Sequence, residues 1–353
     1  MTKTFDIAVV GSGTAGLAAA VTSTRAGART LLIDSRPAAG GTGGFSGLTT
    51  LCGLYDSNGL PLNTGFPQEF SAALAETAPV KMGRVWVLPY RPERFREIAA
   101  ELLAPVTTHW NTPVAVSVTG SRITSVNGFS VGAVIDCTGT AAVAQAVGAP
   151  CLATDETTQA PAVIFPLRDV TCDLSSPAAV AQAVLPLARA GFPLLNFQNN
   201  LDPKTVTVKF TGRVDQVLPA IEFLRRNVPG FERCAVIGEP IQSQRAGRMI
   251  VGRYVLTGAD VLTGKKFPDA VARGAWPVEQ WDAAGTARYR YLPEGKHYEI
   301  PARSLQAASI ENLFMAGKTI SADVDAIASA RVMGVCLATG AAAGKLAILP
   351  FSR

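Results

Sequence analysis

Short apolar runs and longer amphipathic stretches alternate near the start of the chain. Phe5–Val10 is short and mostly apolar and stops at Gly11, which predicts a buried parallel strand. Thr14–Ala26 is rich in alanine and is followed by Gly27, as expected for a helix. The apolar run Arg29–Ile33 predicts a second strand, so the three segments predict one β-α-β unit within about 30 residues.

Further elements follow from the same patterns. Pro92–Leu103 predicts a helix with proline in its first turn. Val114–Val118 and Arg122–Val126 flank a short turn and predict a hairpin, and Ser130–Asp136 predicts a strand that leads into Cys137–Thr140. Asp325–Ala347 is rich in alanine and glycine and predicts one closing helix.

Two stretches break this pattern. Pro37–Gly65 is rich in glycine and has little periodicity, and loops of that length are usually functional. From Ala153 to Tyr298 short alternating segments mix with helices. We therefore expect an α/β fold with a Rossmann-type cofactor-binding domain and a parallel sheet, made of residues 1–152 and 304–353. An inserted α+β substrate or cap domain would take residues 153–303.

Composition narrows the class of protein. Hydrophobic residues make up 48% of the chain and charged residues 17%, which is enough to build a large core. The net charge of +5 comes without a basic run, so we expect no nucleic-acid partner. The sequence has no apolar stretch of membrane-spanning length, no secretory leader pattern and no C-x-x-C pair among its six cysteines. We expect a cytoplasmic protein with no membrane association and no metal site.

The first strand ends in a glycine motif, Gly11-Ser12-Gly13-Thr14-Ala15-Gly16. Such a motif is weak evidence alone, but here it follows a strand and opens a helix, as dinucleotide binding requires. Gly11 permits the tight turn, Gly13 lets the backbone approach a pyrophosphate, and Gly16 lets the helix pack on the strand. The helix N-terminus then offers free N–H groups to the phosphates.

An acid expected to bind the ribose follows at the end of the second strand. Asp34 lies 18 residues beyond Gly16, and a carboxylate there would repel a 2′-phosphate and disfavour NADP. Ser35 and Arg36 come next, and then a glycine pair, Gly40-Gly41. These residues alone leave FAD and NAD as alternatives.

Three segments together resemble the flavoproteins with two dinucleotide-binding folds. Residues 11–41 are similar to their N-terminal fingerprint, in which an acid, a basic residue and a glycine pair bind the FAD adenosine and pyrophosphate. Val134–Gly139 resembles their apolar strand that ends near FAD, and Glu311–Lys318 resembles their C-terminal motif. That motif usually ends in an acid, whereas this chain has Lys318, which could pair with phosphate as a point charge.

The resemblance extends to a subgroup of FAD-dependent oxidoreductases of largely unassigned substrate. It covers Gln244–Gly252, Val261–Asp269, Tyr298–Leu305 and Ser329–Gly334, although relatives more often have proline at the Gly334 position. The similarity is weakest over residues 160–236, where we expect substrate choice to be determined. The resemblance implies FAD as the cofactor. The expected contacts are Gly11, Ser12, Gly13, Thr14, Ala15, Gly16, Asp34, Ser35, Arg36, Gly41, Thr42, Gly47, Val114, Cys137, Thr138, Gly139, Gly317, Lys318, Met333 and Gly334.

The expected activity is oxidation of a small organic substrate by hydride transfer to the flavin. The sequence has no second G-x-G-x-x-G after a strand, so a docked nicotinamide is not indicated and the electron acceptor is open. Oxygen or a carrier protein would fit. A flavin monooxygenase, a protein-modifying flavoenzyme and a non-catalytic FAD-binding protein are the alternatives.

Several residues are candidates for the chemistry. Arg245 and Arg248 could hold a substrate carboxylate, or form ion pairs between domains. Cys52, just after the glycine-rich pyrophosphate loop at Gly40–Gly44, could shape the pocket, react with substrate or tether the flavin, or be inert and buried. His297 could accept a proton as hydride leaves, or lie on the surface.

Two further features could lie near the flavin. The segment Arg331–Val335 would point backbone N–H groups at the pyrimidine end of the ring, which becomes anionic on reduction, or it would only pack. Trp276 and Trp281 could line the substrate pocket, or pack in the core.

Overall fold

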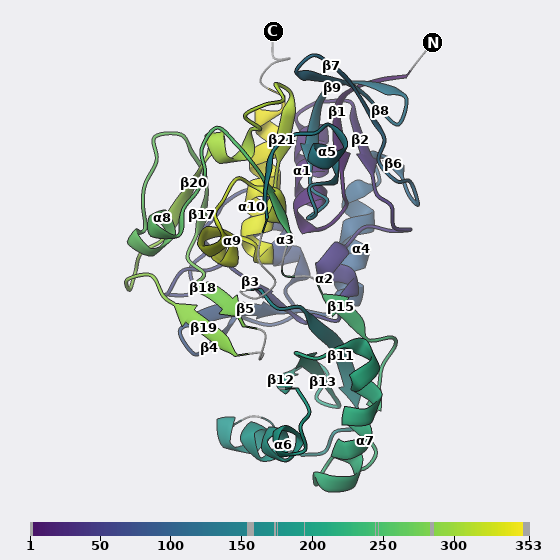
Figure 1. The fold of residues 1–353 in the computed structure, drawn as a ribbon, viewed down its shortest axis with the longest axis vertical. Helices are drawn as coiled ribbons and strands as arrows, with labels where there is room; N and C mark the ends of the chain where they lie inside the picture. The colour runs from purple at the N-terminus through teal and green to yellow at the C-terminus, as the bar shows by residue number, and fades with distance from the viewer. Residues whose placement is uncertain are drawn as a thin grey trace.

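The computed structural model describes residues 3–153, 159–172, 174, 176–193, 195–243, 245, 247–282 and 286–348. Its main feature is a seven-stranded sheet with the order β6-β2-β1-β9-β8-β7, in which β21 also pairs with β9 (Figure 1). The strands are β1 (Thr4–Val10), β2 (Thr30–Ile33), β6 (Thr107–His109), β7 (Val116–Thr119), β8 (Arg122–Val126), β9 (Phe129–Asp136) and β21 (Leu313–Met315). The expected α/β class with a parallel sheet is confirmed.

Strand register brings four loops to one edge of this sheet. β1 runs parallel to β2 and β9, with Val10 opposite Ile33 and Asp136. β21 runs parallel to β9, with Met315 also opposite Asp136. The carboxyl ends of parallel strands meet at one edge, which is where ligands bind in open α/β sheets. The segments that follow Val10, Ile33, Asp136 and Met315 therefore lie together.

Two helices pack against one another through small residues on one side of the sheet. α1 (Thr14–Arg25) and α10 (Met333–Leu346) share a hydrophobic core with α3 (Phe66–Leu74) and α4 (Pro92–Leu103). A Cβ added to Gly340 would lie 2.1 Å from the Ala15 carbonyl oxygen, and one added to Gly344 would lie 2.7 Å from that of Ala19. Only glycine allows this approach, which fixes α10 against the cofactor-binding helix.

The predicted single closing helix over Asp325–Ala347 is wrong in one respect, because the structure breaks it in two. α9 (Val324–Ala330) begins at Asp323, whose side chain accepts hydrogen bonds from the Asp325 and Ala326 amides. α10 begins afresh at Met333 after Val332, which has extended backbone angles (φ −69°, ψ 150°). The two helices meet at 96°. The break gives α10 its own N-terminus inside the protein.

A separate lobe forms the lower part of Figure 1. Its antiparallel sheet has the order β12-β13-β11-β14, with β15 also on β11. The strands are β11 (Ala162–Arg168), β12 (Leu195–Asn199), β13 (Thr205–Phe210), β14 (Ala235–Val236) and β15 (Ile241–Ser243). Helices α6 (Pro177–Arg189) and α7 (Val217–Asn227), with the short turn η1 (Val214–Gln216), complete the lobe.

Alternation along β13 gives the lobe sheet two different faces. Val206, Val208 and Phe210 are buried in the core that the sheet shares with α6 and α7. Successive side chains of a strand point to opposite faces, so Thr207 and Lys209 lie on the other face. There the Thr207 hydroxyl donates a hydrogen bond to the Gly47 carbonyl (3.2 Å). The polar face of the lobe sheet is therefore turned towards the cofactor-binding domain.

Residues 249–305 pack differently from the lobe. Most of their buried apolar side chains share one core with α9 and one side of α10, whereas the buried side chains of the lobe form a core of their own. The expected insert 153–303 is thus divided between two cores. This third region holds β16 (Arg248–Ile250), α8 (Gly258–Thr263), β17 (Ala270–Gly274), β18 (Val278–Trp281), β19 (Ala287–Arg290), β20 (Tyr298–Pro301) and η2 (Ala302–Leu305).

The remaining elements surround the glycine-rich stretch. α2 (Gly41–Phe45) and β3 (Thr50–Cys52) form within it, and β3 joins β5 (Val85–Pro89) and β4 (Val80–Met82) in a small antiparallel sheet. α5 (Ala142–Ala146), β10 (Cys151–Ala153) and η3 (Gly317–Thr319) are short. Within the described residues, no single helix is long and apolar enough to cross a membrane, and only the bent pair α9 and α10 passes such a test together. The same residues contain no group of three His, Cys, Asp or Glu placed to hold a metal ion.

Candidate functional site

The glycine loop after β1 has the geometry that a pyrophosphate site needs. A Cβ added to Gly11 (φ +94°) would lie 2.6 Å from the Cys137 carbonyl oxygen, and one added to Gly16 would lie 1.7 Å from that of Gly11. Gly11 and Gly16 are therefore required for the packing of the protein backbone, whether or not a ligand is bound. A Cβ on Gly13, in contrast, would meet only the Cα of Gly41, at 3.9 Å. The space before Gly13 is therefore open to a ligand.

The first turn of α1 supplies donors to that space. The first helical hydrogen bond runs from the Leu17 amide to the Gly13 carbonyl (2.9 Å). The amides of Thr14, Ala15 and Gly16 precede it and have no acceptor within the helix. The helix has no acidic residue in its first turn and no capping side chain, so its partial positive charge is not offset locally. These features fit the diphosphate of a dinucleotide.

Asp34 is buried at the end of β2 and already accepts several hydrogen bonds. Its Oδ2 accepts from the Ser12 amide and hydroxyl (both 2.6 Å) and from the Arg36 guanidinium (2.9 Å). Burial alone would raise the pKa of Asp34, but the hydrogen bonds from Arg36 and Ser12 hold it below its usual value. The carboxylate thus fixes the loop and Arg36 together. Its contact with a ribose stays a prediction.

The glycine pair places a second short helix beside the first loop. A Cβ on Gly41 would lie 2.7 Å from the Gly13 Cα, so the two backbones are in contact. The C-terminal end of α2 is held by hydrogen bonds from α4 and from the residue that follows β5. There the Tyr90 hydroxyl donates to the Gly43 carbonyl (2.8 Å), and Arg96 donates to that of Gly44 (2.6 Å). Gly41 and Thr42 are therefore held near the open space before Gly13.

The turn after β9 is organised by a buried carboxylate. Asp136 accepts hydrogen bonds from the Thr138 amide (3.0 Å) and hydroxyl (2.7 Å), and from the Val143 amide at the start of α5 (3.0 Å). Burial raises the pKa of Asp136. The residue holds Cys137, Thr138 and Gly139 in place beside Gly11, and its side chain faces these amides.

Lys318 lies where the three loops meet. A Cβ on Gly139 would be 2.8 Å from its Cε, and a Cβ on the neighbouring Gly317 would be 2.9 Å from the Ala15 side chain. Burial lowers the pKa of the Lys318 ammonium, and the charges of Arg331 and Arg36 act in the same direction. A cation so placed, near the first turn of α1, suits an anionic cofactor.

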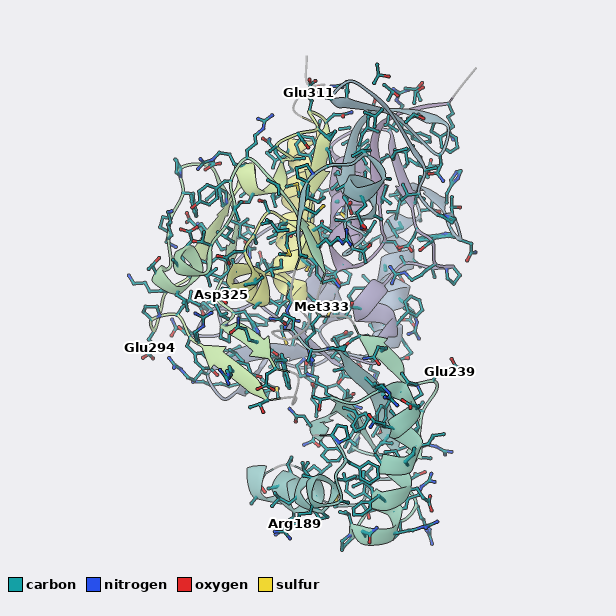
Figure 2. The ribbon with its side chains drawn as sticks, viewed as in Figure 1. Arg189, Glu239, Glu294, Glu311, Asp325 and Met333 are labelled. Atoms are coloured by element: carbon teal, nitrogen blue, oxygen red, sulfur yellow. The ribbon has the colours of Figure 1, made fainter. Side chains whose placement is uncertain are left out.

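The N-terminus of α10 reaches the middle of the protein, as the position of Met333 in Figure 2 shows. A Cβ on Gly334 would lie 2.4 Å from the carbonyl carbon of Gly53, so the first turn of α10 packs directly on the backbone that follows β3. This first turn has no acidic residue and no capping side chain. Its free amides fit the expected role towards the pyrimidine end of a flavin.

A charged cluster, Lys209, Arg245, Glu279 and Arg331, lies beside this helix start. Glu279 on β18 accepts hydrogen bonds from the indole N–H groups of Trp276 (Oε2, 2.9 Å) and Trp281 (Oε1, 2.6 Å). Burial would raise its pKa, but the charge of Arg331 and the two indoles hold it below the usual range, and Lys209 contributes. Glu279 is therefore ionised at neutral pH.

The two arginines of the charged cluster have neutral partners. Arg245 donates to the Ala160 carbonyl (2.7 Å), and its guanidinium carbon lies 4.3 Å from the centre of the Trp281 ring. Arg331 reaches the Glu279 backbone carbonyl with Nη2 (3.4 Å), while its buried Nε has no hydrogen-bond partner among the residues that the structure describes. Burial and the charge of Arg331 lower the pKa of Arg245 to about 10.

Cys52 borders the charged cluster. Burial raises the pKa of its thiol to about 11, and the charges that act on it include Lys209, Glu279 and Arg331. At neutral pH it is a neutral thiol, which is a poor nucleophile. Cys52 thus lies beside the charged cluster as a neutral thiol, and its place at the reactive face of a flavin stays a prediction.

The structure places His297 in other surroundings. Burial lowers its pKa, and the charges of Lys266 and Arg273 act in the same direction. None of the residues whose charges act most strongly on His297 belongs to the charged cluster. His297 directly precedes β20, and Glu294, three residues earlier, lies at the outer edge of the protein in Figure 2.

The other expected site residues are divided between the cofactor side and the surface. Arg248 is exposed on β16 opposite Ala153. Val114 is half-buried and packs against the core on the α5 side of the sheet. Gly47 contacts the lobe, since its added Cβ would lie 3.5 Å from Pro166.

Sequence reasoning missed two members of the charged cluster, Lys209 and Glu279. Glu279 lies between Trp276 and Trp281, both of which were singled out, and a lone acid between two tryptophans was the available signal. Lys209 is the one charged residue in the apolar alternation of β13. Neither pattern indicates which distant segment the charge will meet.

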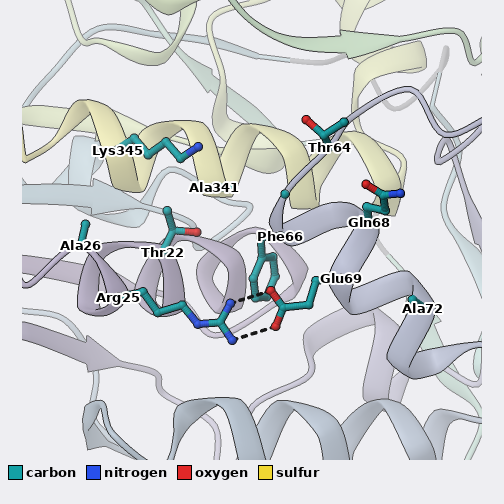
Figure 3. A pocket seen from close by; sticks show the side chains of 11 residues that line it. Thr22, Arg25, Ala26, Thr64, Phe66, Gln68, Glu69, Ala72, Ala341 and Lys345 are labelled. Carbon is teal, nitrogen blue, oxygen red and sulfur yellow. Dashed lines mark hydrogen bonds and ion pairs between the residues drawn. The ribbon is translucent and has the colours of Figure 1, made fainter.

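A surface hollow of about 650 Å³ lies away from these groups (Figure 3). Thr22, Arg25, Phe66 and Lys345 are among its lining residues, and an ion pair between Arg25 and Glu69 (2.6 Å) borders it. Thr22 is eight residues beyond the start of α1, about 12 Å along the axis at 1.5 Å per residue. The hollow therefore belongs to the end of α1 opposite the glycine loop.

Comparison with solved structures defines the class. A geranylgeranyl bacteriochlorophyll reductase-like protein from Thermoplasma acidophilum matches with a TM-score of 0.54 and 14% identity, over 99% of this chain and 79% of that one. The Aquifex aeolicus GidA structure (TM-score 0.56, 12% identity, 99% and 64% coverage) and the aromatic hydroxylase CabE (0.55, 12%, 99% and 63%) also match. This chain thus spans less than two thirds of the latter two. At such identities the likeness shows the fold, that of Rossmann-type flavoproteins.

The family is more specific. The sequence profile described as FAD dependent oxidoreductase matches residues 6–204 and 189–352, so the chain belongs to this family. It is an enzyme that uses FAD, and the expected cofactor is confirmed. No curated protein sequence matches significantly.

Proposed function

We propose that this enzyme oxidises a small polar organic substrate, which gives up a hydride to FAD. The observation that carries the proposal is the charged cluster beside the start of α10. It combines the half-buried carboxylate of Glu279 with two arginines and, from the lobe sheet, Lys209, and Cys52 borders it. Buried charges of this kind gather where a polar molecule must be bound and oriented.

The cofactor would be held by the loops at the carboxyl edge of the main sheet. Gly13 with the first turn of α1 would face the diphosphate, assisted by Lys318, and Asp34 with Arg36 would face the adenosine end. The start of α10 at Met333 and Gly334 would face the pyrimidine end of the ring. When bound, FAD supplies the two-electron acceptor.

The side chains of the charged cluster orient the substrate and do not remove its proton. Cys52 has a pKa of about 11 and Arg245 one of about 10, while Glu279 stays ionised with both oxygens hydrogen-bonded to indoles. A general base works best with a pKa near the working pH, and these three groups lie far from it. The substrate therefore binds with its amine or hydroxyl positioned for transfer, and its proton leaves to solvent.

The lobe of residues 160–243 would cover the substrate. Its polar face is tied to the segment after α2, where Gln198 donates to the Thr49 hydroxyl (2.9 Å) and Thr49 donates to Asn200 (2.7 Å). The lobe also carries Lys209, and it coincides with the stretch of weakest family resemblance. We propose that substrate specificity is determined there.

A flavin monooxygenase is the second candidate. The observation that favours it is the antiparallel lobe sheet beside the cofactor-binding domain, within a fold that matches the hydroxylase CabE over 99% of this chain. In that case NADH or NADPH would reduce the flavin, and the organic substrate would take up oxygen.

Anaerobic reduction of the purified yellow protein distinguishes the two. We expect a member of a panel of amines and hydroxy acids to bleach the flavin absorbance without NAD(P)H. Rapid bleaching by NAD(P)H alone, together with no bleaching by any member of the panel, would overturn the proposal in favour of the monooxygenase.

A further inference from the structure

Arg245 and Arg331 are two half-buried cations that contact no carboxylate of the described residues. Among the described residues, neither has a carboxylate oxygen within 4.0 Å of a guanidinium nitrogen, and their hydrogen bonds go to the backbone carbonyls of Ala160 and Glu279. Nε of Arg331 is buried and finds no hydrogen-bond partner within the described part of the chain. A buried charged donor without an acceptor costs free energy, so its retention needs an explanation.

Glu279 does not supply the missing acceptor. Its two carboxylate oxygens are occupied by the indole N–H groups of Trp276 and Trp281. Among the described members of the charged cluster, three cations thus face one carboxylate. The positive charges of Arg245 and Arg331 also repel one another, and this repulsion contributes to the lowered pKa of Arg245.

An anion placed between the two guanidinium groups would remove both costs. Arginine offers a planar fork of N–H donors that matches a carboxylate, and the stacking of Arg245 on Trp281 fixes the plane of that fork. The nearby start of α10 adds a further positive end. The arrangement is therefore selective for negative charge and for a planar, two-oxygen group.

We propose that Arg245 and Arg331 bind the carboxylate of the substrate, so that the enzyme acts on a small carboxylic acid bearing an oxidisable amine or hydroxyl. This inference rests on the proposed function and names the substrate class for the same site. Oxidation of the carbon that bears the amine or hydroxyl moves a hydride to FAD and a proton to solvent, which leaves an imine or a carbonyl.

Binding of simple carboxylates to the FAD-loaded protein tests the inference without turnover. The probes are acetate, propionate and benzoate, each compared with its neutral amide by calorimetry and by the flavin difference spectrum. We expect at least one carboxylate to bind about tenfold or more tightly than its amide, the order expected for a charged hydrogen-bonded pair. Equal binding of acid and amide, or no binding of any of the three acids, would overturn the inference.

Variants assign the binding to the arginines. Arg245→Gln should weaken carboxylate binding about 10- to 100-fold and leave FAD affinity unchanged. Arg189→Gln is the matched control, since it removes one positive charge at the far end of the lobe (Figure 2) and should change neither quantity. Unchanged carboxylate affinity in Arg245→Gln, or a loss of FAD in its place, would refute the assignment. These binding measurements need no reaction, so they test the inference even if no substrate bleaches the flavin. A failure to bleach would count only against the proposed oxidation.

Discussion

Replacing Gly13 by alanine separates cofactor binding from folding. Gly13 has φ −67° and ψ −173°, which alanine adopts without strain, and its added Cβ would meet only the Gly41 Cα at 3.9 Å. The protein alone therefore tolerates the methyl group, apart from a loss of up to about 1 kcal/mol at a helix N-cap. With FAD bound, the same methyl group enters the space of the diphosphate.

The expected loss of FAD affinity follows from the cost of overpacking. An extra methyl group in a filled space costs about 1–3 kcal/mol, which is about 5- to 150-fold in the dissociation constant at 1.4 kcal/mol per tenfold. Titration of the FAD-free protein, followed by flavin fluorescence, measures this constant. Thermal unfolding of the same FAD-free protein measures the effect on the fold.

Two further glycines serve as controls. Gly16→Ala should prevent proper folding, because its Cβ would lie 1.7 Å from the Gly11 carbonyl oxygen. Gly128→Ala, in the turn before β9, has open space but φ +81°, so it should cost about 1–2 kcal/mol of stability and leave FAD affinity unchanged. Wild-type FAD affinity in Gly13→Ala would refute the placement of the diphosphate. Unfolding of the FAD-free Gly13→Ala protein would instead show that Gly13 is needed by the fold.

Three other changes follow from the pKa values. The depressed pKa of Asp34 stabilises the fold at pH values above its unfolded pKa of about 3.9. Asp34→Asn should therefore lower the free energy of unfolding by about 1–3 kcal/mol at pH 7, and the difference should vanish as the pH falls through the folded pKa. A pH-independent difference in denaturant unfolding would contradict this. Cys52, with a pKa of about 11, should react with iodoacetamide at pH 8 about 10²-fold more slowly than an ordinary thiol. Acid precipitation of the protein should release all flavin into the supernatant, and a coloured pellet would show a covalent link. His297→Ala should lower the rate of anaerobic flavin reduction by much less than the roughly 10²-fold loss of a general base, and a loss of that size would restore His297 to the reaction.

The cofactor side of the protein was predictable because its residues are contiguous in sequence. Residues 4–36 form a strand, a glycine turn, a helix and a second strand, and each element is specified by local pattern. Parallel pairing then brings the turn after Asp136 and the segment at Gly317 to the same edge without further information. The family resemblance identified these same segments, and the structure joins them through glycine contacts.

The charged cluster was only partly predictable, for a physical reason. Its charges come from β13, from the segment before β16, from β18 and from the end of α9. The sequence around each of them predicts ordinary secondary structure and gives no sign of a shared site. A buried charge is stabilised by partners that can come from any part of the chain. Arg245 and Arg248 were both proposed to bind a carboxylate from their residue type, and no periodicity distinguishes them. The structure places Arg248 on the exposed side of β16, whereas Arg245 lies in the charged cluster.

The break in the closing helix shows how tertiary contact overrides local pattern. Residues 325–347 have good helical composition throughout, and no proline at position 334 or elsewhere in this stretch marks a helix start. This chain has glycine there because a side-chain atom would lie 2.4 Å from the Gly53 backbone. The loop after β3 therefore approaches the first turn of α10 too closely for any side chain at position 334, and Cys52, the last residue of β3, directly precedes that loop. Close packing of Gly53 on Gly334 fixes the position of the α10 N-terminus and of the Cys52 thiol beside it. One contact, which neither segment specifies alone, therefore places both the partial positive charge of the helix end and the neutral thiol.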